Sequence, residues 1–523
     1  MTQWARAPQN REQMVLFSER LDDALPSDHT VRLLDEILQR LEWAKWEACY
    51  HGRLGQPPIH PRIMAGVLLY GLLKRIRTSR SLEEALIVRM DFRWLAEGRT
   101  IDHTTLSEFR RRHAAELKDV FVQIGLVARQ LGLLNLQLLA FDGTRLRANN
   151  RRSGTRTPAE LREMQASLAS KYIELEAQAA AEDARDDEAF GPQSPHALPA
   201  ELADVKRRQA QVDAALAEIE RVQQAGETVP KRLPLTDPQS RLTPNKEGGF
   251  APNYTPLATV DVESGLIVSA DVIAMTNEDK HLASAIRDVQ QQFGLDRPSP
   301  EMLADGLLAT GANLAELAEL GVTLYSPVSG ADPATNPALR DDPTQPVPSE
   351  AWDRLPMKKV RIAGKQGLQL DKAAFVYDAE RDCYWCPQGQ ALAYAHTTSE
   401  AGGSGPRVRD RYVAAAEVCA ACPLRERCMQ GQTKRRQINR EQHEALRVQH
   451  ARRMATPEAQ EKYARRRHPG ERPFAMIKHH FGARRFLLRG LKQVRVEWQW
   501  LATAFNLHRL MRLIRGRAGP AAA

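Results

Sequence analysis

The apolar positions of the first 130 residues follow helical spacing. Hydrophobic side chains recur every three or four positions over residues 31–38 and again over 63–73, the pattern of helices that bury one face. Pro61 stands where the second of these helices would begin, and the first turn tolerates proline because its N–H groups have no internal partner. The pattern therefore predicts an N-terminal helical domain over residues 1–130.

Two further helices are expected in this segment. Ser79 or Ser81 is placed to cap one of them, and Thr104 or Thr105 is placed to cap the other. The second of these helices ends in three arginines at 110–112. Short helices that end in basic residues and are joined by tight turns resemble a helix-turn-helix DNA-binding module, and a plain helical bundle is the alternative.

A different pattern begins at residue 136, where short apolar runs predict β-strands. Residues 136–141 are mostly apolar and end at Asp142-Gly143, and residues 302–304 end in the same way at Asp305-Gly306. Between them, two runs around the turn at 263–265 predict a β-hairpin, and a further strand is expected at 322–325. Strands and helices in this order predict a mixed α/β sheet.

Two long insertions interrupt the predicted sheet. Residues 158–227 are rich in Ala, Glu and Gln and predict two antiparallel helices, over about 158–184 and 199–225, with a break at Gly191-Pro192-Gln193-Ser194-Pro195. Residues 327–450 contain a proline-rich linker, a cluster of cysteines and a basic helical tract. Helical pattern then dominates from 458 to 515.

The composition favours a soluble protein of several domains over a membrane or secreted protein. The chain has 523 residues, of which 42% are hydrophobic and 27% charged, so several soluble domains are expected. The longest apolar run, 63–73, is too short to span a bilayer, and the N-terminus lacks a signal-peptide pattern. We therefore expect a cytoplasmic protein with no membrane partner.

The net charge of +9 is unevenly distributed. Residues 431–523 contain 22 Lys or Arg and 6 acidic residues, a local balance of +16, so the rest of the chain sums to −7. Such a basic segment indicates a polyanionic partner, and a solvated helical surface gives the same count.

Asp142 and Asp305 each follow a predicted strand. In open α/β sheets, sites form at the carboxyl ends of strands, so these two carboxylates are expected side by side. Two carboxylates at one place repel each other unless a cation neutralises them, and hard oxygen ligands suit Mg²⁺ or Mn²⁺. Taken singly, each Asp-Gly pair is also an ordinary turn signal.

Glu471 is a third candidate acid, within the basic C-terminal segment. Pro473 is compatible with a helix that begins close to Glu471. Glu471 and Lys478 would then stand two turns apart on one face, with Phe474 and Ile477 packed inward. One acid and one base on the same side of a helix are unusual for a merely solvated face.

The three acids stand in motifs that resemble those of bacterial insertion-sequence transposases of the DDE class. Phe141-Asp142-Gly143-Thr144 and Ala304-Asp305-Gly306 look like the first two acids of their RNase H-like fold. The stretch from Tyr463 to Lys478 is similar to their tyrosine–arginine–glutamate–lysine signature. The resemblance covers nearly the whole chain, and its further matches are residues 52–80, Asp102-His103-Thr104-Thr105, Thr236-Asp237-Pro238-Gln239-Ser240-Arg241, Cys422-Pro423-Leu424-Arg425 and Val494-Arg495-Val496-Glu497-Trp498.

Two arginines compete for the signature position. Arg467 has the family's three-residue gap to Glu471, whereas Arg466 has the expected spacing from Tyr463. A second departure follows the second acid, where the family usually has glycine and aromatic residues and this chain has Leu307-Leu308-Ala309.

The resemblance implies an enzyme that hydrolyses phosphodiester bonds at transposon ends and transfers the strand into target DNA. Asp142, Asp305 and Glu471 would hold two Mg²⁺ or Mn²⁺ ions for this chemistry. The residues that bind DNA phosphates would be Arg467, Lys478 and Tyr463. The resemblance also implies a homodimer or larger assembly on DNA, in the cytoplasm of a bacterium and on the nucleoid when bound.

Five of the six cysteines lie between positions 383 and 428. Cys383 and Cys386 form one C-x₂-C pair, Cys419 and Cys422 form a second, and Cys428 follows. Paired thiols at this spacing predict a structural zinc ion with four sulfur ligands. We expect the ligands to be the two pairs, with Cys428 as the alternate to Cys422; redox-active or idle thiols are the alternatives.

The predicted fold is mixed α/β. A helical DNA-binding domain would occupy 1–130, and an RNase H-like core would be assembled from 135–150, 250–330 and 455–515. A helical arm at 153–230 and a cysteine-rich, zinc-ribbon-like insertion at 331–450 would interrupt the core. Two other functions stay open, namely a catalytically inactive transposase-derived DNA-binding protein and a metal-dependent repair nuclease without preference for terminal sequences.

Other polar residues near the predicted strands are given structural roles. Asp261 lies beside the hairpin turn, where an aspartate serves the backbone. Asn277, Asp279 and His281 stand at the start of a helix predicted over about 278–293 and are expected to cap it.

Overall fold

The computed structural model describes residues 20–50, 57–190, 200–245, 248–275, 277–295, 300–328, 335–362, 365–402, 405–430 and 433–517. These residues form two compact units. The helical unit takes its described residues from Met1–Ala128, Ile477–Gly482 and Gln499–Ala523. The sheet unit takes its own from Arg129–Met476 and Ala483–Trp498.

The secondary structure confirms a mixed α/β chain. Helices dominate the helical unit, whereas the sheet unit contains a seven-stranded sheet, a five-stranded sheet and two two-stranded sheets among its described residues. Within the described ranges, we find no helix whose length and apolar character would let it cross a membrane.

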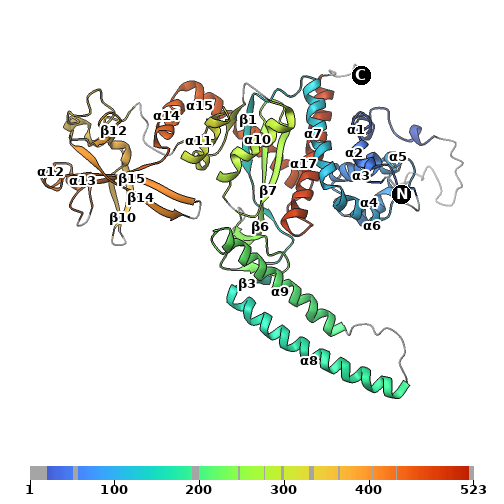
Figure 1. Ribbon diagram of the computed structural model, residues 1–523. Coiled ribbons are helices and arrows are strands. Elements are labelled where there is room, and N and C mark those ends of the chain that lie inside the picture. Colours follow the sequence, from blue (N-terminus) through green and yellow to red (C-terminus); the bar gives the residue numbers. More distant parts are fainter. Residues whose placement is uncertain are drawn as a thin grey trace, which may run out of the picture. The chain divides into compact units, whose positions relative to one another are not determined.

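Helix α3 (Pro61–Leu73) lies at the centre of the helical unit (Figure 1). Every residue of α3 except Arg62 is buried, and Pro61 occupies its first turn as predicted. A helix that is apolar on all sides must be surrounded by other elements. The helices that contact α3 are α1 (Thr30–Gln39), α4 (Ser79–Val88), α5 (Met90–Leu95) and α6 (His103–Arg112).

Two helix caps differ from those predicted. The hydroxyl of Thr78, one residue before the expected Ser79, accepts the N–H of Ser81 at 3.2 Å at the start of α4. Asp102, rather than the two threonines that follow His103, caps α6 through hydrogen bonds of 2.8 and 3.0 Å. In both cases the helix begins one to three residues earlier than the expected capping residues suggested, and an earlier side chain reaches the free N–H groups.

The structure divides the C-terminal stretch that was expected to belong to the core. Within the helical unit, the indole of Trp500 donates to the carbonyl of Arg110 at 3.4 Å. Arg77 donates to the carbonyl of Gly482 at 3.2 Å in the same unit. Residues 477–482 and the part of α17 (Leu491–Arg517) after Trp498 therefore pack with the N-terminal helices.

The seven-stranded sheet is the core of the sheet unit. Strand β1 (Leu138–Gly143) lies between β6 (Phe250–Asp261) and β8 (Glu301–Leu303). It is antiparallel to β6 and parallel to β8, whose other neighbour, β9 (Thr323–Tyr325), is also parallel. β7 (Ile267–Ile273) pairs with β6 and completes the predicted hairpin. The five strands thus form three antiparallel strands followed by two parallel ones.

Helices cover this sheet and fix its core. α10 (Leu282–Phe293) contacts β7, and α16 (Arg467–Ala475) contacts β1 and β6. α11 (Gly311–Glu319) and α15 (Pro457–Ala464) contact β9. The buried side chains between α15 and the strands belong to Leu138, Ala140, Leu303, Tyr325 and Ala459.

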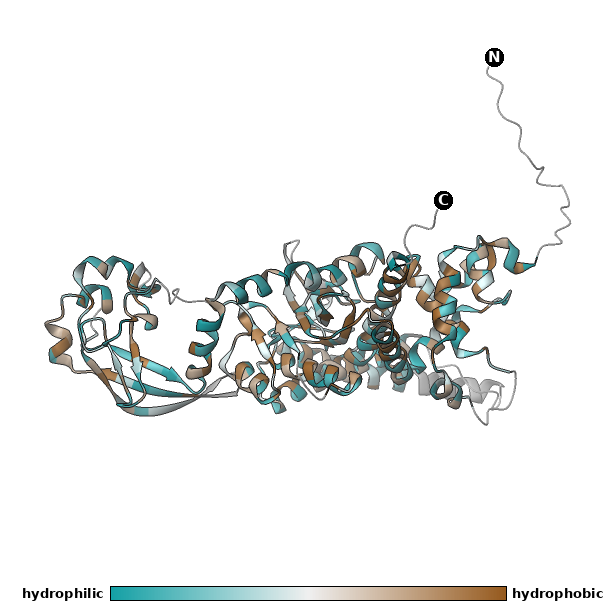
Figure 2. Cartoon of the chain, turned by 90° about the horizontal axis from the view of Figure 1, so that it is seen from above, coloured by the Kyte–Doolittle hydropathy of each residue, from teal (hydrophilic) through white to brown (hydrophobic). Residues whose placement is uncertain are grey.

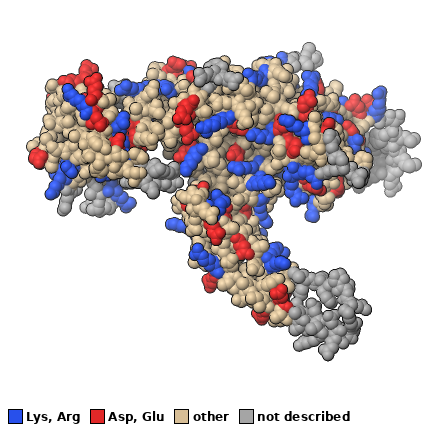
Figure 3. Space-filling model, viewed as in Figure 1, with Lys and Arg blue, Asp and Glu red and all other residues tan. Residues whose placement is uncertain are grey.

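The predicted arm is a pair of long helices, α8 (Pro158–Phe190) and α9 (Ala200–Gln224) (Figure 1). They contact each other through a small core that includes Leu161, Val212 and Ile219. Both signs of charge are mixed along the arm in Figure 3, as expected of a solvated helical pair. The predicted break at 191–195 lies outside the described residues.

The cysteine-bearing segment forms an antiparallel sheet in the order β12-β13-β14-β15-β16. Its long hairpin is made of β14 (Ala391–Gly402) and β15 (Gly405–Ala414), and Figure 2 shows hydrophilic residues along these strands. The shorter strands are β12 (Val376–Asp378), β13 (Cys383–Trp385) and β16 (Gln437–Glu441). The segment has a hydrophobic cluster of its own, which includes Tyr384, Leu392 and Tyr412.

Candidate active site at the ends of two parallel strands

Asp142 and Asp305 lie together at one edge of the seven-stranded sheet. β1 and β8 pair in parallel with Leu138 opposite Glu301 and Ala140 opposite Leu303. Continuing this register by two residues places Asp142 beside Asp305. The sequence pattern had predicted this juxtaposition, because parallel neighbours end at the same edge.

The two carboxylates differ in their exposure to solvent. The side chain of Asp142 is 21% exposed, whereas that of Asp305 is 57% exposed. Burial raises the pKa of Asp142, the charge of Arg466 opposes this, and the charges of Asp305 and Glu471 raise it further. Asp142 is therefore the inner carboxylate of the pair, and Asp305 faces solution.

Helix α16 brings Glu471 to the same place. Gly470 lies directly against Asp142, because a Cβ added to Gly470 would stand 3.7 Å from both Cβ and Oδ2 of Asp142. Glu471 follows Gly470 in the helix and is exposed, and its charge acts on Asp142. Three acids from distant parts of the chain thus share one neighbourhood.

The helix that carries Glu471 begins earlier than predicted. α16 starts at Arg467, so Pro473 lies inside the helix and not in its first turn. Pro469 occupies the first turn instead, where a missing N–H costs nothing. The chain continues from α16 into a π-helical turn, Met476–His480, and Phe474 and Ile477 are buried as expected.

Arg466 is the arginine that contacts the acids. Its Nη2 lies 3.2 Å from Oδ1 of Asp142 and 3.9 Å from Oδ2 of Asp305, and its side chain is 15% exposed. Arg467 is exposed on the following position of the chain. The structure therefore gives the contact with the acids to Arg466, the residue that keeps the family's spacing from Tyr463.

A fourth carboxylate, which the sequence analysis missed, belongs to Glu278. Its carboxyl group packs against the α-carbon of Gly143, because a Cβ added there would lie 2.5 Å from Cδ and 2.7 Å from Oε2 of Glu278. Burial raises the pKa of Glu278 to about 7, and the charges of Asp142 and Asp305 raise it in the same direction. No spacing marks this glutamate in the sequence, because it stands in a polar turn that resembles a helix start.

Of the residues expected to cap the helix near Glu278, only Asn277 has a side-chain bond of this kind. Neither the 3-10 turn Asp279–His281 nor α10 has a side-chain hydrogen bond at its cap. Asn277 accepts the N–H of Asp279 only at 3.5 Å. Asp279 and His281 thus form no side-chain bond at the helix start. His281 is partly buried, and burial lowers its pKa.

The electrostatics of the cluster fit a bound cation. Four carboxylates and two guanidinium groups, those of Arg466 and Arg145, leave an excess of negative charge, and burial makes the charges of Asp142 and Glu278 costly to keep. Carboxylate oxygens are hard ligands of the kind that Mg²⁺ and Mn²⁺ prefer. Burial and the neighbouring carboxylates raise the pKa of both Asp142 and Glu278, and a bound cation would lower it.

Tyr463 and Lys478, the other residues of the predicted signature, stand in α15 and in the π-helical turn. Tyr463 is half-buried in α15. Lys478 belongs to the helical unit, whereas the acids belong to the sheet unit. In α15, Lys462 forms ion pairs with Glu301 at 2.9 Å and with Glu458 at 3.1 Å.

Asp261 has the structural role that its position at the hairpin predicted. Its carboxylate is fully buried and accepts the N–H of Leu136 at 3.1 Å. It also accepts the N–H and hydroxyl of Ser264 at 2.8 and 2.6 Å. Asp237, in another motif of the resemblance, accepts the hydroxyl of Tyr254 at 2.6 Å and the N–H of Gly490 at 3.2 Å. These two buried aspartates hold loops in place.

A second polar cluster lies in the helical unit, where Cys49, His113 and Glu116 place one ligand atom each within 4.8 Å of one another. The hydroxyl of Tyr50 lies 2.8 Å from Nε2 of His113, and the Cys49 thiol lies 3.3 Å from Glu116. These hydrogen bonds account for the cluster without an ion.

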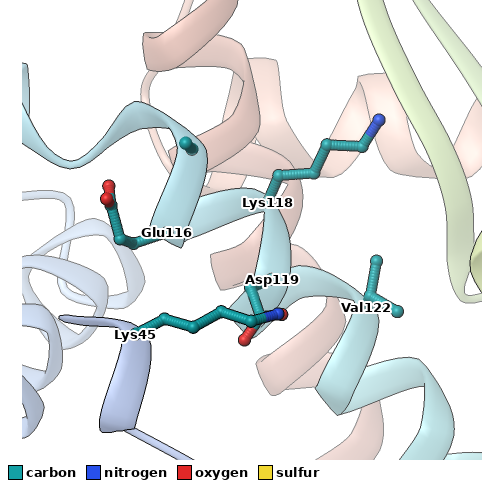
Figure 4. A pocket seen from close by; sticks show the side chains of 6 residues that line it. Lys45, Glu116, Lys118, Asp119 and Val122 are labelled. Carbon is teal, nitrogen blue, oxygen red and sulfur yellow. The ribbon is translucent and has the colours of Figure 1, made fainter. Parts of the chain in front are cut away.

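A pocket of about 470 Å³ adjoins this cluster. Figure 4 shows the side chains that line it from α2 (Ala44–Ala48) and α7 (Ala114–Gln130), and Lys45 pairs with Asp119 across it.

Comparison with family models finds two transposase domains in the chain. Residues 385–511, which include Glu471, match the model of a transposase DDE domain. Residues 19–112 match the model of a transposase domain (DUF772). No curated protein matches the chain significantly. The two matches fall on the segments that carry the third acid and the N-terminal helices, and together they indicate an insertion-sequence DDE transposase.

Proposed function

We propose that the chain cuts DNA at transposon ends and joins the freed strand to target DNA. One observation carries the proposal: Asp142, Asp305 and Glu471, from three distant segments, meet where two parallel strands end. Transposition itself follows from the family. The alternatives of an inactive DNA-binding relative and of a repair nuclease are outcomes of the tests below.

The strand order supports an RNase H-like core. Three antiparallel strands, β7, β6 and β1, are followed by the parallel strands β8 and β9. We propose that 135–150, 250–330 and 455–515 contribute this core, the last of these through its residues in the sheet unit, with the arm at 153–230 and the cysteine-rich segment at 331–450 inserted into it. The N-terminal helices, 1–130, would bind DNA, and Arg111 is exposed on α6 for this purpose.

Asp142, Asp305 and Glu471 would hold two Mg²⁺ or Mn²⁺ ions, and Glu278 adds a further carboxylate. Such ions supply an activated hydroxyl group and stabilise the oxygen that leaves phosphorus. Asp142 would be the ligand in the middle of the metal site, because it contacts Arg466, lies beside Asp305 and adjoins Gly470. Asp305 and Glu471 are open to solution, as residues that meet DNA must be.

Arg466 would serve the carboxylate site directly. Its guanidinium lies between two carboxylates that would otherwise repel each other. A planar guanidinium suits phosphate as well as carboxylate, so Arg466 is placed to hold a phosphate once the acids are neutralised. Arg467, Lys478 and Tyr463 would bind phosphates beside the cleaved bond. Transposon-end DNA and target DNA are the substrates, and at least two copies would act together, in the cytoplasm.

The proposal is tested with the full chain and a DNA duplex that carries an end of its own element. Nicking at the end in Mg²⁺, followed by joining of the 3′ strand to a second duplex, is expected. Binding without cleavage would support the inactive DNA-binding relative. Equal cleavage of duplexes with and without the element's end would support a repair nuclease.

The contact between the Glu278 carboxyl group and Gly143 predicts the effect of two substitutions on cleavage. Replacing Gly143 by Ala is expected to reduce cleavage by about 10- to 100-fold, the usual effect of disturbing groups around metal ligands. The added methyl group would occupy the place of the Glu278 carboxyl and force it away. Glu278→Gln should reduce cleavage to a similar extent, whereas Asp279→Asn, one residue away, should leave it unchanged. Full activity of both Gly143→Ala and Glu278→Gln would remove Glu278 from the site.

The raised pKa of Glu278 predicts how divalent ions stabilise the protein at different pH. Because its pKa is about 7 in the folded protein and 4.5 ordinarily, the folded state binds the proton more tightly. The free energy of unfolding should therefore fall as pH rises between these values. Bound Mg²⁺ replaces the proton, so the increase in melting temperature that Mg²⁺ causes should be small at pH 6 and larger at pH 8. An increase that does not change with pH would contradict the account, and Glu278→Gln should weaken the dependence.

A further inference from the structure

We infer that the cysteine-bearing sheet holds one structural zinc ion through Cys386, Cys419, Cys422 and Cys428, and that Cys383 takes no part. This ligand set differs from the one that the spacing of C-x₂-C pairs favours. The inference does not depend on the carboxylate site, since it concerns other residues and another kind of ion.

The four ligands share one hydrophobic cluster. Cys419 and Cys428 are 8% and 9% exposed within it, and Cys386 and Cys422 pack against it. Burial raises the pKa of Cys428 to about 12, and the other three thiolates would each raise it further. Each pair among the four is thus close enough for one charge to act on the other.

Strand geometry excludes Cys383. Successive side chains of a strand point to opposite faces, and Tyr384, in the middle of β13, belongs to the hydrophobic cluster. Cys383 therefore points to the other face, whereas Cys386, two positions after Tyr384, returns to the cluster. The groups that act on Cys383 are Asp378, Arg381 and Asp382, and none is a thiol.

A buried arginine, Arg436, lies beside these thiols. Arg436 is 5% exposed, its guanidinium lies 4.9 Å from the ring centre of Phe375, and the charges of Cys428, Asp371 and Cys419 act on it. Its guanidinium donates to the carbonyls of Cys428 at 2.7 Å and Leu370 at 2.8 Å. Arg425 donates to the carbonyl of Cys419 at 3.2 Å. Keeping a buried guanidinium charged is costly, and thiolate ligands would add to the negative charge that Asp371 supplies.

Zinc accounts for both the thiols and the arginines. Four thiols that bind Zn²⁺ release four protons to solvent, and the resulting tetrathiolate centre keeps two negative charges beside Arg425 and Arg436. The structure shows no three of these sulfur atoms within 4.8 Å of one another, so binding requires their side chains to turn inward. All five cysteines of the segment are free thiols.

The ion would join parts of the sheet that are distant in sequence. Cys386 follows β13, whereas Cys419 and Cys428 lie in the short helices α12 (Ala416–Ala420) and α13 (Arg425–Cys428), beyond the β14–β15 hairpin (Figure 1). A helix of four or five residues is not stable alone. A tetrahedral centre would hold both helices against the sheet.

The experiment measures zinc in the full-length protein, purified without chelator, by elemental analysis. We expect one zinc per chain in the wild type, in Cys383→Ser and in Cys49→Ser, the last of which tests the cluster in the helical unit. Each of Cys386→Ser, Cys419→Ser, Cys422→Ser and Cys428→Ser should lose it. No zinc in the wild type, loss in Cys383→Ser, or full retention in any of the four others would overturn the inference.

A second measurement covers variants that fail to fold. Wild-type protein and Cys383→Ser, exchanged into Co²⁺, should both show the intense charge-transfer absorption of cobalt bound by thiolates in a tetrahedral site. Titration with a mercurial reagent should release the metal as four thiols react. Release after fewer than four thiols, or weak absorption typical of oxygen and nitrogen ligands, would contradict the four-cysteine site.

Discussion

Replacing Asp142, Asp305 or Glu471 by Ala is expected to abolish Mg²⁺-dependent cleavage of the transposon end. A loss of about 10³-fold or more is expected for each, equivalent to about 4 kcal/mol in the activation free energy. The reason is that the three carboxylates gather at the ends of β1 and β8 and beside Gly470, so that removing one takes away a ligand the others cannot replace. The measurement is single-turnover nicking of an end-labelled duplex.

The controls separate chemistry from folding and from DNA binding. Each variant should bind the end duplex as well as the wild type when Ca²⁺ replaces Mg²⁺, because the basic surfaces are untouched. Glu319→Ala removes an exposed acid of α11 and should cleave normally. Cleavage by any of the three alanine variants at the wild-type rate would remove that acid from the catalytic set.

Arg466→Ala is expected to have the second largest effect. Without divalent ions, Arg466 is the cation that lies between Asp142 and Asp305, so its loss leaves their repulsion unopposed. The melting temperature in chelator should fall, and Mg²⁺ should restore most of the difference. Cleavage should fall by about 10- to 100-fold, because the arginine orients metal ligands. Thermal unfolding and the nicking assay measure the two effects.

Two variants show whether the effect belongs to this arginine. Arg466→Lys keeps the charge without the planar guanidinium, so it should recover stability in chelator but not full cleavage. Arg465→Ala is the matched control, since Arg465 pairs with Glu263 at 3.6 Å and does not contact the acids in any described ion pair. If Arg466→Ala unfolds at the wild-type temperature in chelator, the ion pairs contribute nothing measurable.

The sequence predicted the parts of the site that depend on local patterns. The apolar run before Asp142 and the shorter one before Asp305 predicted two strands, and the Asp-Gly pairs marked their ends. The structure has these strands, and their parallel register brings the aspartates together. The hairpin and the two arm helices also followed from alternation and composition.

What the sequence did not predict depends on how distant elements pack. The choice between Arg466 and Arg467 is decided by the start of α16 relative to β1, because neighbouring residues of a helix point about 100° apart. Glu278 comes to the site only because the turn after β7 folds over the end of β1. Neither packing arrangement leaves a periodic signal in the chain.

The cysteines illustrate the same limit. A C-x₂-C pair suggests that both thiols bind one ion, but this holds only where the chain turns between them. Cys383 lies within a regular strand that pairs with β14, so the pleat sends its side chain away from Cys386. The face of β13 to which each cysteine points decides the ligand set, and this face is known only once the strand is placed in its sheet.

The most direct test of the central claim uses Fe²⁺ as the ion. Iron bound in place of Mg²⁺, with ascorbate and peroxide, generates hydroxyl radicals that cut the polypeptide near the metal. The account predicts backbone cuts near Asp142, Asp305 and Glu471 together, all suppressed by excess Mg²⁺ and all lost in Asp142→Ala. Cuts at only one of these segments, or a pattern that Mg²⁺ does not change, would show that the three acids do not share a metal site.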